Sequence, residues 1–349
     1  MLRAIDRFGL MSKSLNIIPD DRKHEFDRST RPTYLWIGKY KINGRRKMTQ
    51  MKDILVGMAV GDAFGVPYEF LSREEAGRRV TETIEGWGTH NQPPGTWSDD
   101  TSLALCTADA IARGYHLDKV AKNFVRWLDE GFWTPHGQVF DIGGTTRDAI
   151  DRLRSGVDPV LAGGQEERDN GNGSLMRILP ILKYFEHTGN YDDQTIADLS
   201  ALTHRHLRSI KACVILIRFA QMVSHHGIRQ AFDTLKLEIQ NDSFRLDEQA
   251  PHFKRLLHLE EFPESDIRSD GYVIHTLEAS IWCLLKTKNY KDAVLKAVRL
   301  GGDTDTTACV VGGLAGIMYG WHSIPADWLD AIARKEDIMA LCDQLEAVQ

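Results

Sequence analysis

From Met51 onward, apolar residues recur at spacings of three and four, which is the period of one face of an α-helix. Alternation of apolar and polar residues, typical of strands, is nearly absent. The pattern therefore predicts an all-α fold, a compact domain of many helices. The clearest predicted helical segments are 117–128, 196–202, 210–223, 274–285 and 293–300.

Two further segments predict helices that pack unusually closely. Residues 54–70 are apolar and carry Gly57, Gly61 and Gly65 at a spacing of four, which places the glycines on one helix face. Residues 307–319 carry three more glycines. Because a glycine costs about 1 kcal/mol of helix propensity relative to alanine, we expect these glycines to serve close backbone contacts. Residues 241–271, charged and broken by two prolines, predict an insertion between core helices.

Two short acidic clusters stand where predicted loops become helices. They are Ser98-Asp99-Asp100-Thr101 and Asp303-Thr304-Asp305-Thr306. Taken alone, the first has the pattern of an ordinary N-cap with acidic residues in the first turn. If the fold brings the clusters together, their carboxylates repel one another, and oxygen ligands of this kind suit Mg²⁺ or Mn²⁺. The sequence thus predicts a divalent-metal site.

Other segments carry further candidate functional residues. Asp62 has a buried position in its predicted helix, where capping or hydrogen bonding is as good an interpretation as catalysis. Glu69 follows Pro67 and is predicted to project from a loop. Residues 169–179 are interpreted as a glycine-rich turn leading into an amphipathic helix. Backbone amides at such a helix start can hold a phosphate or diphosphate, although the same turn also fits a plain loop.

Five motifs together carry a resemblance to a known family. They are GDAFGVPYEF, SDDT, GNGSLMR, the pair Thr203-His204 and GGDTDT, and they occur in this order between residue 51 and about residue 320. In this respect the chain resembles the ADP-ribosylglycohydrolases of the dinitrogenase-reductase-activating type. The resemblance implies an all-α fold with two Mg²⁺ or Mn²⁺ ions. It also implies removal of ADP-ribose from modified arginine or serine, or action on a related ADP-ribose derivative.

The resemblance also assigns roles to residues. His204 lies in a run with Arg205 and His206, where a histidine by itself is more typical of a surface or core position, so its role rests on the family position alone. Glu69 matches an acidic residue at the mouth of the site. The implied metal ligands are Ser98, Asp99, Asp100, Asp303, Asp305 and Thr306. The implied substrate-binding residues are Asp141, Gly143, Gly144, Gly171, Asn172, Gly173, Met176 and His204.

These residue types suit cleavage of an N-glycosidic bond. The reaction passes through an oxocarbenium-like state, so the site must orient the sugar hydroxyls and polarise a water molecule. Two cations can do both, and a nearby carboxylate can accept the proton of the water. We expect Asp100 or Glu69 to have this catalytic role and leave both open. A metal-dependent phosphohydrolase acting on a nucleotide is a weaker alternative, distinguished by release of a mononucleotide in place of intact ADP-ribose.

Composition sets outer bounds on location. The chain has 349 residues, 42% of them hydrophobic, which suffices for a sizeable helical core. Its five cysteines are scattered and odd in number, which favours a reducing cytoplasm over a disulfide framework. With neither an apolar leader nor a run of eighteen apolar residues, we expect no secretion signal and no membrane span.

The first fifty residues differ in charge from the remainder. They contain twelve Lys and Arg against five Asp and Glu, a net charge of +7, whereas residues 51–349 carry −13. Residues 34–42 alternate aromatic and basic side chains and have strand character. We therefore predict two domains, a basic N-terminal extension over residues 1–50 and a catalytic domain over residues 51–349.

Several interpretations of the extension remain open. One interpretation is that the extension packs on its own acidic domain or is partly disordered. In the same interpretation, Met11 or Met48 can be the true start of translation. Binding to nucleic acid is disfavoured, because the segment is short, lacks a recognised motif and belongs to an acidic protein. Binding to a membrane surface is disfavoured further. Binding to a protein partner is slightly preferred. In that form the chain resembles immunity proteins against ADP-ribosyltransferase toxins, in which an extension occludes the toxin and hydrolysis is either additional or secondary.

Overall fold

The computed structural model describes residues 36–37, 40–41 and 49–347. The chain divides into two units, residues 1–45 and residues 46–349. In the first unit, β1 (Trp36–Ile37) pairs antiparallel with β2 (Tyr40–Lys41), with Trp36 opposite Lys41. Both short strands fall within the segment for which the sequence predicts strand character. The remainder of the predicted N-terminal extension lies mainly outside the described residues.

In the second unit, residues 49–347 form α-helices and short 3-10 helices, which confirms the predicted all-α class. The α-helices are α1 (Met51–Gly65), α2 (Arg73–Arg79), α3 (Asp99–Ala112), α4 (Leu117–Glu130), α5 (Gly144–Arg154), α6 (Ile181–Thr188), α7 (Asp193–Ala201), α8 (Leu207–Gln240), α9 (Ala250–Phe253), α10 (Val273–Leu285), α11 (Tyr290–Arg299), α12 (Thr304–Tyr319), α13 (Ala326–Ala331) and α14 (Lys335–Ala347). The 3-10 helices are η1 (Val66–Tyr68), η2 (Pro159–Leu161), η3 (Glu167–Asp169), η4 (Asp247–Gln249), η5 (Lys254–Glu261), η6 (Glu264–Asp266) and η7 (Trp321–Ser323).

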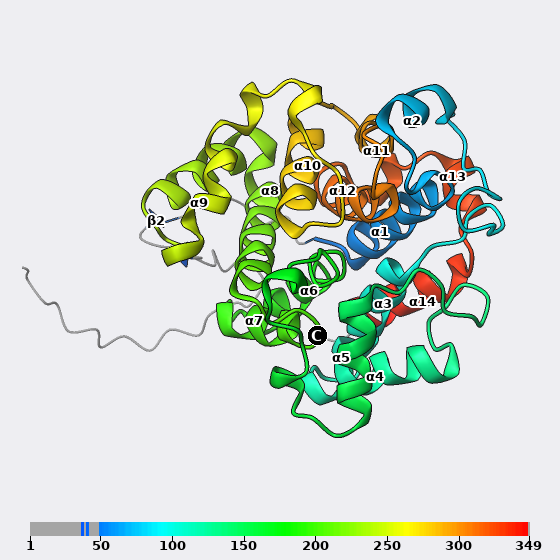
Figure 1. Cartoon of the computed structure of the whole chain (residues 1–349), viewed down its shortest axis with the longest axis horizontal. Helices are drawn as coiled ribbons and strands as arrows, with labels where there is room; N and C mark the ends of the chain where they lie inside the picture. Colours follow the sequence, from blue (N-terminus) through cyan, green and yellow to red (C-terminus); the bar gives the residue numbers. More distant parts are fainter. Residues whose placement is uncertain (1–35, 38–39, 42–48, 348–349) are drawn as a thin grey trace, which may run out of the picture. The chain divides into compact units, whose positions relative to one another are not determined.

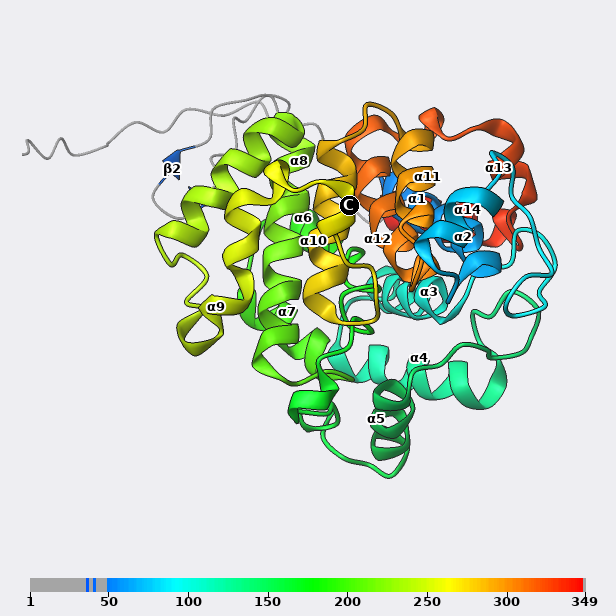
Figure 2. The ribbon, with the colours of Figure 1, turned by 45° about the horizontal axis from the view of Figure 1, so that its top comes forward.

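Helices α1 and α12 lie side by side at the centre of this unit (Figures 1 and 2). Nearly every residue of both is buried, as expected of helices that are apolar on all sides. Their glycines make the contact, as the sequence predicts: a Cβ on Gly57 would lie 2.4 Å from the carbonyl oxygen of Gly312. A Cβ on Gly61 would lie 2.0 Å from that of Ala308. The pair therefore forms a core against which α3, α8, α10, α11 and α14 pack.

The predicted helical segments all fall within α4, α7, α8, α10 and α11, apart from one residue at the end of two of them. One prediction is wrong. The glycine-rich segment 169–179 does not continue directly into a helix: its residues form turns, and α6 begins only at Ile181. Pro180 accounts for the difference, because its ring would clash with the carbonyl group of Met176 in a continuous helix. The segment therefore presents a loop, without the N-terminus of a regular helix.

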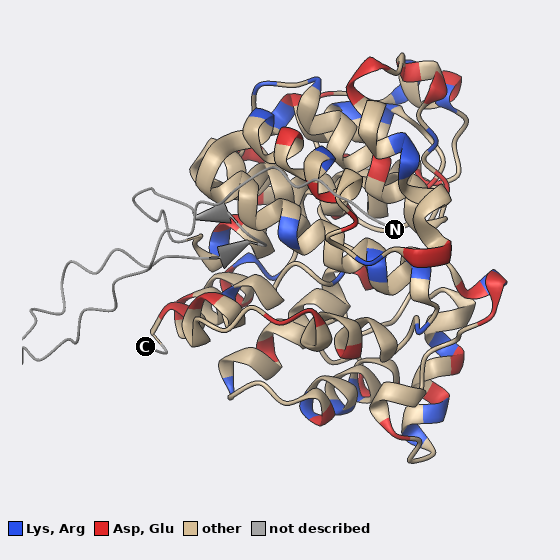
Figure 3. Ribbon diagram, turned by 90° about the vertical axis from the view of Figure 1, so that its left-hand side faces the viewer, with Lys and Arg blue, Asp and Glu red and all other residues tan. Residues whose placement is uncertain are grey.

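The charged insertion between α8 and α10 contains only short elements, α9 and η4 to η6. Figure 3 shows acidic and basic positions interspersed over the helices. Among the described residues, no single helix has the length and hydropathy to cross a membrane, although Met51–Tyr68 and Arg73–Arg79 reach that composition together across a 107° bend.

Candidate active site

A cavity of about 440 Å³ opens where the starts of α3, α5 and α12 meet the glycine-rich loop. It contains part of each acidic cluster, so the structure brings together two segments that are about 200 residues apart. The residues that line it are Glu69, Phe70, Asp99, Asp100, Asp141, Ile142, Gly143, Gly144, Thr145, Thr146, Gly171, Asn172, Gly173, Met176, His204, Gly271, Asp303 and Thr306.

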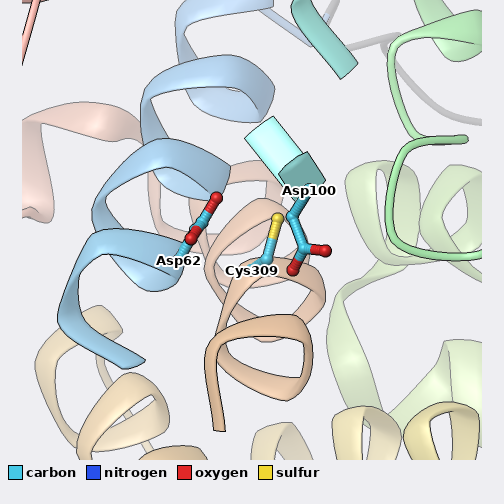
Figure 4. Close-up of side chains that lie close together, drawn as sticks. All are labelled: Asp62, Asp100 and Cys309. Atoms are coloured by element: carbon cyan, nitrogen blue, oxygen red, sulfur yellow. The ribbon is translucent and has the colours of Figure 1, made fainter. Parts of the chain in front are cut away.

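The first acidic cluster is held in place by Asp62 of α1. Both carboxylate oxygens of Asp62 accept hydrogen bonds from the backbone amide of Ser98, at 2.9 and 3.1 Å. Thr101 adds its amide at 3.0 Å and its hydroxyl at 2.6 Å. Asp62 lies close to Asp100 and Cys309 (Figure 4). Because donors already surround its oxygens, Asp62 serves to anchor the start of α3.

Ser98 is at the same time the N-cap of α3, since its hydroxyl accepts a hydrogen bond from the amide of Asp100 at 3.3 Å. The capping interpretation of this cluster is therefore correct for Ser98. It does not account for Asp99 and Asp100, which are buried and line the cavity. A surface cap has no need to bury carboxylates.

The second cluster enters the cavity from a tightly bound loop. Gly301 and Gly302 both have a φ of 72°, in the left-handed region that glycine adopts at no steric cost. The turn they form lets the amide of Asp303 donate to the carbonyl of Ser269 at 2.7 Å. One oxygen of Asp303 accepts a 2.7 Å hydrogen bond from the side chain of Asn172. The first bond ties the start of α12 to the segment before α10, and the second ties it to the glycine-rich loop.

The carboxylates in this region are strongly perturbed. Burial, followed by the charge of Asp303, raises the pKa of Glu69 to about 8. Burial raises the pKa of Asp62 to about 7, and burial followed by the charge of Glu69 raises that of Asp141 to about 7. Burial also raises the pKa values of Asp99, Asp100, Asp303 and Asp305. Without a cation, the site therefore disfavours full ionisation.

Several of these oxygens accept no hydrogen bond from the described residues. They are Oδ2 of Asp100, Oδ1 of Asp303 and both oxygens of Asp305, all of them buried. Oxygen atoms of Glu69, Asp303 and Asp305 also lie within 4.8 Å of one another. Buried carboxylates without donors are costly unless a cation neutralises them, and hard oxygen ligands suit Mg²⁺ or Mn²⁺. The residues present therefore fit a divalent-metal site.

Glu69 has a second set of neighbours at the mouth of the cavity. Nε2 of His90 forms a short hydrogen bond with Oε2 of Glu69 and lies 3.7 Å from Oδ1 of Asp141. The His90 ring also contacts the rings of Phe70 and Phe140, with centroid distances of 6.1 and 5.4 Å. The mouth thus combines two carboxylates with aromatic rings.

The glycine-rich loop borders the cavity next to His204. A Cβ on Gly173 would lie 2.6 Å from Cε1 of His204, so only glycine fits without displacing the imidazole. His204 is buried, and its Nδ1 lies 2.9 Å from the hydroxyl of Thr203. Burial lowers the pKa of His204 to about 3, which keeps the ring neutral at physiological pH. A neutral ring can still accept or donate a hydrogen bond to a ligand.

All predicted site residues but two line the cavity. Ser98 and Asp305 do not, since both are buried behind it, although Asp305 lies close to Glu69 and Asp303. Sequence reasoning missed His90, Phe70 and Thr146. Phe70 follows Glu69 directly and so could have been proposed. His90 and Thr146 lie outside the motifs, and no pattern in the sequence singles them out.

Comparisons with known proteins identify the family of the chain. Residues 45–349 match the family model described as ADP-ribosylglycohydrolase. The chain is 33% identical over 336 residues to the ADP-ribosylarginine hydrolase Tri1 of Serratia proteamaculans, covering 91% of this chain and 85% of the relative. It is 31% identical to the protein of that name from Pseudomonas putida, covering 91% and 83%. A solved structure of an ADP-ribosylglycohydrolase-related protein complex matches with a TM-score of 0.68 at 30% identity, covering 84% of this chain and 95% of that one.

Fold, site and comparisons together define a glycohydrolase with an all-α catalytic unit. The chain belongs to the ADP-ribosylglycohydrolase family. Each match to Tri1 covers 91% of the chain. Residues 45–349, which match the family model, make up a smaller share of the chain. Each match to Tri1 therefore also includes part of residues 1–44. Part of the basic extension is therefore shared with these relatives.

Proposed function

We propose that this protein hydrolyses the N-glycosidic bond of ADP-ribosyl-arginine on proteins and so reverses ADP-ribosylation. The observation that carries the proposal is the group of buried, donor-free oxygens of Asp100, Asp303 and Asp305 beside a cavity of about 440 Å³. This volume lies within the range of about 300–1,000 Å³ for small-molecule sites. The names of the two relatives support arginine as the modified residue.

Two Mg²⁺ or Mn²⁺ ions are the proposed cofactors. Their proposed ligands are Ser98, Asp99, Asp100, Asp303, Asp305 and Thr306. The two clusters are in direct contact, because the Thr306 hydroxyl donates a 3.4 Å hydrogen bond to Oδ1 of Asp100. When bound, such ions orient sugar hydroxyls and polarise water. Asp62 fixes the position of the first cluster, and Asn172 fixes that of Asp303.

The remaining residues bind the substrate and move protons. Gly171, Gly173 and Met176 border the space for the diphosphate and ribose, and His204 offers a neutral ring to the nucleotide. Asp141, Gly143 and Gly144 form the facing loop. Asp100 or Glu69 accepts the proton of the attacking water, and the raised pKa of Glu69 also suits donation to the leaving nitrogen.

The test is incubation of the protein and Mg²⁺ with a peptide that carries ADP-ribosyl-arginine, followed by chromatography of the products. Intact ADP-ribose and unmodified arginine are expected. Release of a mononucleotide would instead favour the phosphohydrolase alternative, and no release from this peptide but release from ADP-ribosyl-serine would assign a different linkage.

A second function rests on the charge of residues 1–50, which carry +7 against −13 in the remainder. We propose that this extension binds an ADP-ribosyltransferase toxin and blocks it, so that the protein confers immunity both by occlusion and by hydrolysis. The opposite net charges of the two parts and the overlap of the relatives with this segment support the proposal. Neither nucleic acid nor a membrane is a proposed partner, and a cytoplasmic location is proposed.

A further inference from the structure

Phe70 is an exposed aromatic residue at the mouth of the catalytic cavity. The residue is 68% exposed, yet it lines the cavity that contains part of each acidic cluster. Its backbone has a φ of 65°, in the left-handed region where a residue with a Cβ is strained. A glycine or asparagine would adopt this conformation at lower cost, and a polar side chain would suit the exposure. The position therefore carries a large ring at a cost to stability.

The backbone of Phe70 is fixed relative to the second acidic cluster. Its amide donates a 2.7 Å hydrogen bond to the carbonyl of Gly302, the residue that precedes Asp303. The preceding residue, Glu69, is buried and lies close to Asp303 and Asp305. Phe70 thus stands one residue outside the carboxylate group, where the cavity opens to solvent.

A separate loop holds the surroundings of Phe70 in place. The amide and hydroxyl of Thr89 donate to the carbonyls of Pro67 and Glu69, at 3.2 and 2.6 Å. The same loop carries His90, which bonds to Glu69 and lies 3.7 Å from Asp141. Its ring contacts those of Phe70 and Phe140. The two carboxylates and the two phenyl rings are therefore grouped around one imidazole.

This combination selects for a cation. Aromatic faces attract cations, above all guanidinium groups, and carboxylates within the same rim add a charge-assisted hydrogen bond. In their ionised forms Glu69 and Asp141 would repel a diphosphate, so the rim does not suit the nucleotide part of the substrate. The part of the substrate that must leave through the mouth is the modified side chain, which remains attached to the target protein.

We propose that Phe70, together with Glu69 and Asp141, forms a subsite for the guanidinium group of the modified arginine and determines specificity for this leaving group. The inference rests on the proposed function and adds the residue that recognises the leaving group. Phe70 stacks against the guanidinium plane. His90 is a positioning residue, which holds the carboxylates of Glu69 and Asp141 where both can bind the guanidinium group.

The test compares Phe70→Leu, which keeps an apolar side chain but removes the ring, with Phe70→Tyr, which keeps the ring. Trp87→Leu is the matched control, because Trp87 is 63% exposed, also has a left-handed backbone with a φ of 60°, and does not line the cavity. For the ADP-ribosyl-arginine peptide, Phe70→Leu is expected to raise KM about fivefold. Phe70→Tyr and Trp87→Leu should stay within about twofold of wild type, and the affinity for free ADP-ribose should not change in any variant.

A binding experiment tests the subsite without turnover. Arginine amide and citrulline amide, which has a neutral group of the same shape, are titrated into protein saturated with ADP-ribose. Wild type should prefer arginine amide about fivefold, and Phe70→Leu should lose this preference. Equal binding of both amides by wild type, or an equal loss of ADP-ribose affinity in Phe70→Leu, overturns the subsite. Failure of wild type to release ADP-ribose from the peptide, with the amide preference intact, overturns the proposed reaction and leaves the subsite supported.

Discussion

The hydroxyl of Thr101 in α3 donates a 2.6 Å hydrogen bond to Oδ2 of Asp62 in α1, and both side chains are buried. This bond joins the helix that carries the first acidic cluster to the central helix of the fold. It acts together with the amides of Ser98 and Thr101, so Asp62 accepts several donors from one helix start. The position of Asp99 and Asp100 therefore depends on a residue that is not a proposed ligand.

Thr101→Val should weaken both the fold and the metal site. The change keeps the side-chain shape but removes a donor to a buried carboxylate, which costs about 1.5–3 kcal/mol. Thr107→Val is the control, because within the described part of the chain the Thr107 hydroxyl bonds only to the carbonyl of Leu103 in its own helix. We expect urea unfolding to show the loss for Thr101→Val, together with a smaller Mg²⁺-induced rise in Tm. Equal losses in the two variants would contradict a role for this bond in the site.

Gly61→Ala should destabilise the protein strongly. The added Cβ would lie 2.0 Å from the carbonyl oxygen of Ala308, so α1 and α12 must separate. Overpacking of this kind costs about 1–3 kcal/mol, and the unfolding free energy should fall by about that amount. Gly77→Ala provides the contrast: this glycine lies in α2 with open space around its Cβ position, and alanine should stabilise the helix by about 0.5–1 kcal/mol.

The metal-free protein should become less stable as pH rises from 5 to 8. Burial raises the pKa of Glu69 to about 8 and those of Asp62 and Asp141 to about 7, well above the values of about 4 in an unfolded chain. Between these limits the folded state keeps protons that the unfolded state has released, so the unfolding free energy falls with pH. Thermal melts in EDTA measure this fall. Millimolar Mg²⁺ should reduce it, because a cation stabilises the ionised carboxylates, and Glu69→Gln should reduce it even in EDTA.

The sequence predicts the two central helices well because their signals are local. A helix that is apolar on all sides and has glycines at a spacing of four is expected to pack closely against another helix. The close approach of Gly61 to the carbonyl of Ala308 is a contact of this kind. The acidic clusters were predicted to meet, and both contribute to the cavity. The sequence predicts the glycine-rich loop only in part, because Pro180 separates its turns from α6.

Other features of the site depend on long-range contacts. His90 reaches Glu69 only because its loop docks on Pro67, through hydrogen bonds that no periodic pattern encodes. The sequence leaves the role of Asp62 open between capping or hydrogen bonding and catalysis, because a buried aspartate suits each of them and its partners are distant in the chain. Its partners Ser98 and Thr101 are 36 and 39 residues away.

Asp305→Asn and Glu69→Gln should separate metal binding from catalysis. Both oxygens of Asp305 lack a donor among residues 49–347, so we expect its amide variant to lose the Mg²⁺-induced rise in Tm along with ADP-ribose release. In EDTA the same variant should be at least as stable as wild type, because one buried charge has been removed from a repelling group. If Glu69 acts in proton transfer, Glu69→Gln should lower kcat about 100-fold or more while most of the Tm rise remains. Asp148→Asn, at an exposed position in α5, controls for loss of charge alone.

Removal of residues 1–47 should separate partner binding from hydrolysis. The extension supplies basic and aromatic side chains, whereas every proposed catalytic residue lies at or beyond Glu69. The shortened protein is therefore expected to release ADP-ribose at a rate within about twofold of wild type, yet to lose tight binding to a cognate ADP-ribosyltransferase toxin. Asp305→Ala in the full chain should show the opposite behaviour, with hydrolysis lost and inhibition of the toxin retained.

Salt provides a further test of the same interface. Exposed charges are screened over about 8 Å at physiological ionic strength, so toxin binding by the full chain should weaken as salt is raised. Calorimetric titration of the toxin with the full and the shortened protein, at low and high salt, measures both effects. If the two proteins bind the toxin with the same affinity, the extension has no part in recognition, and the protein acts on the toxin's product through its active site alone.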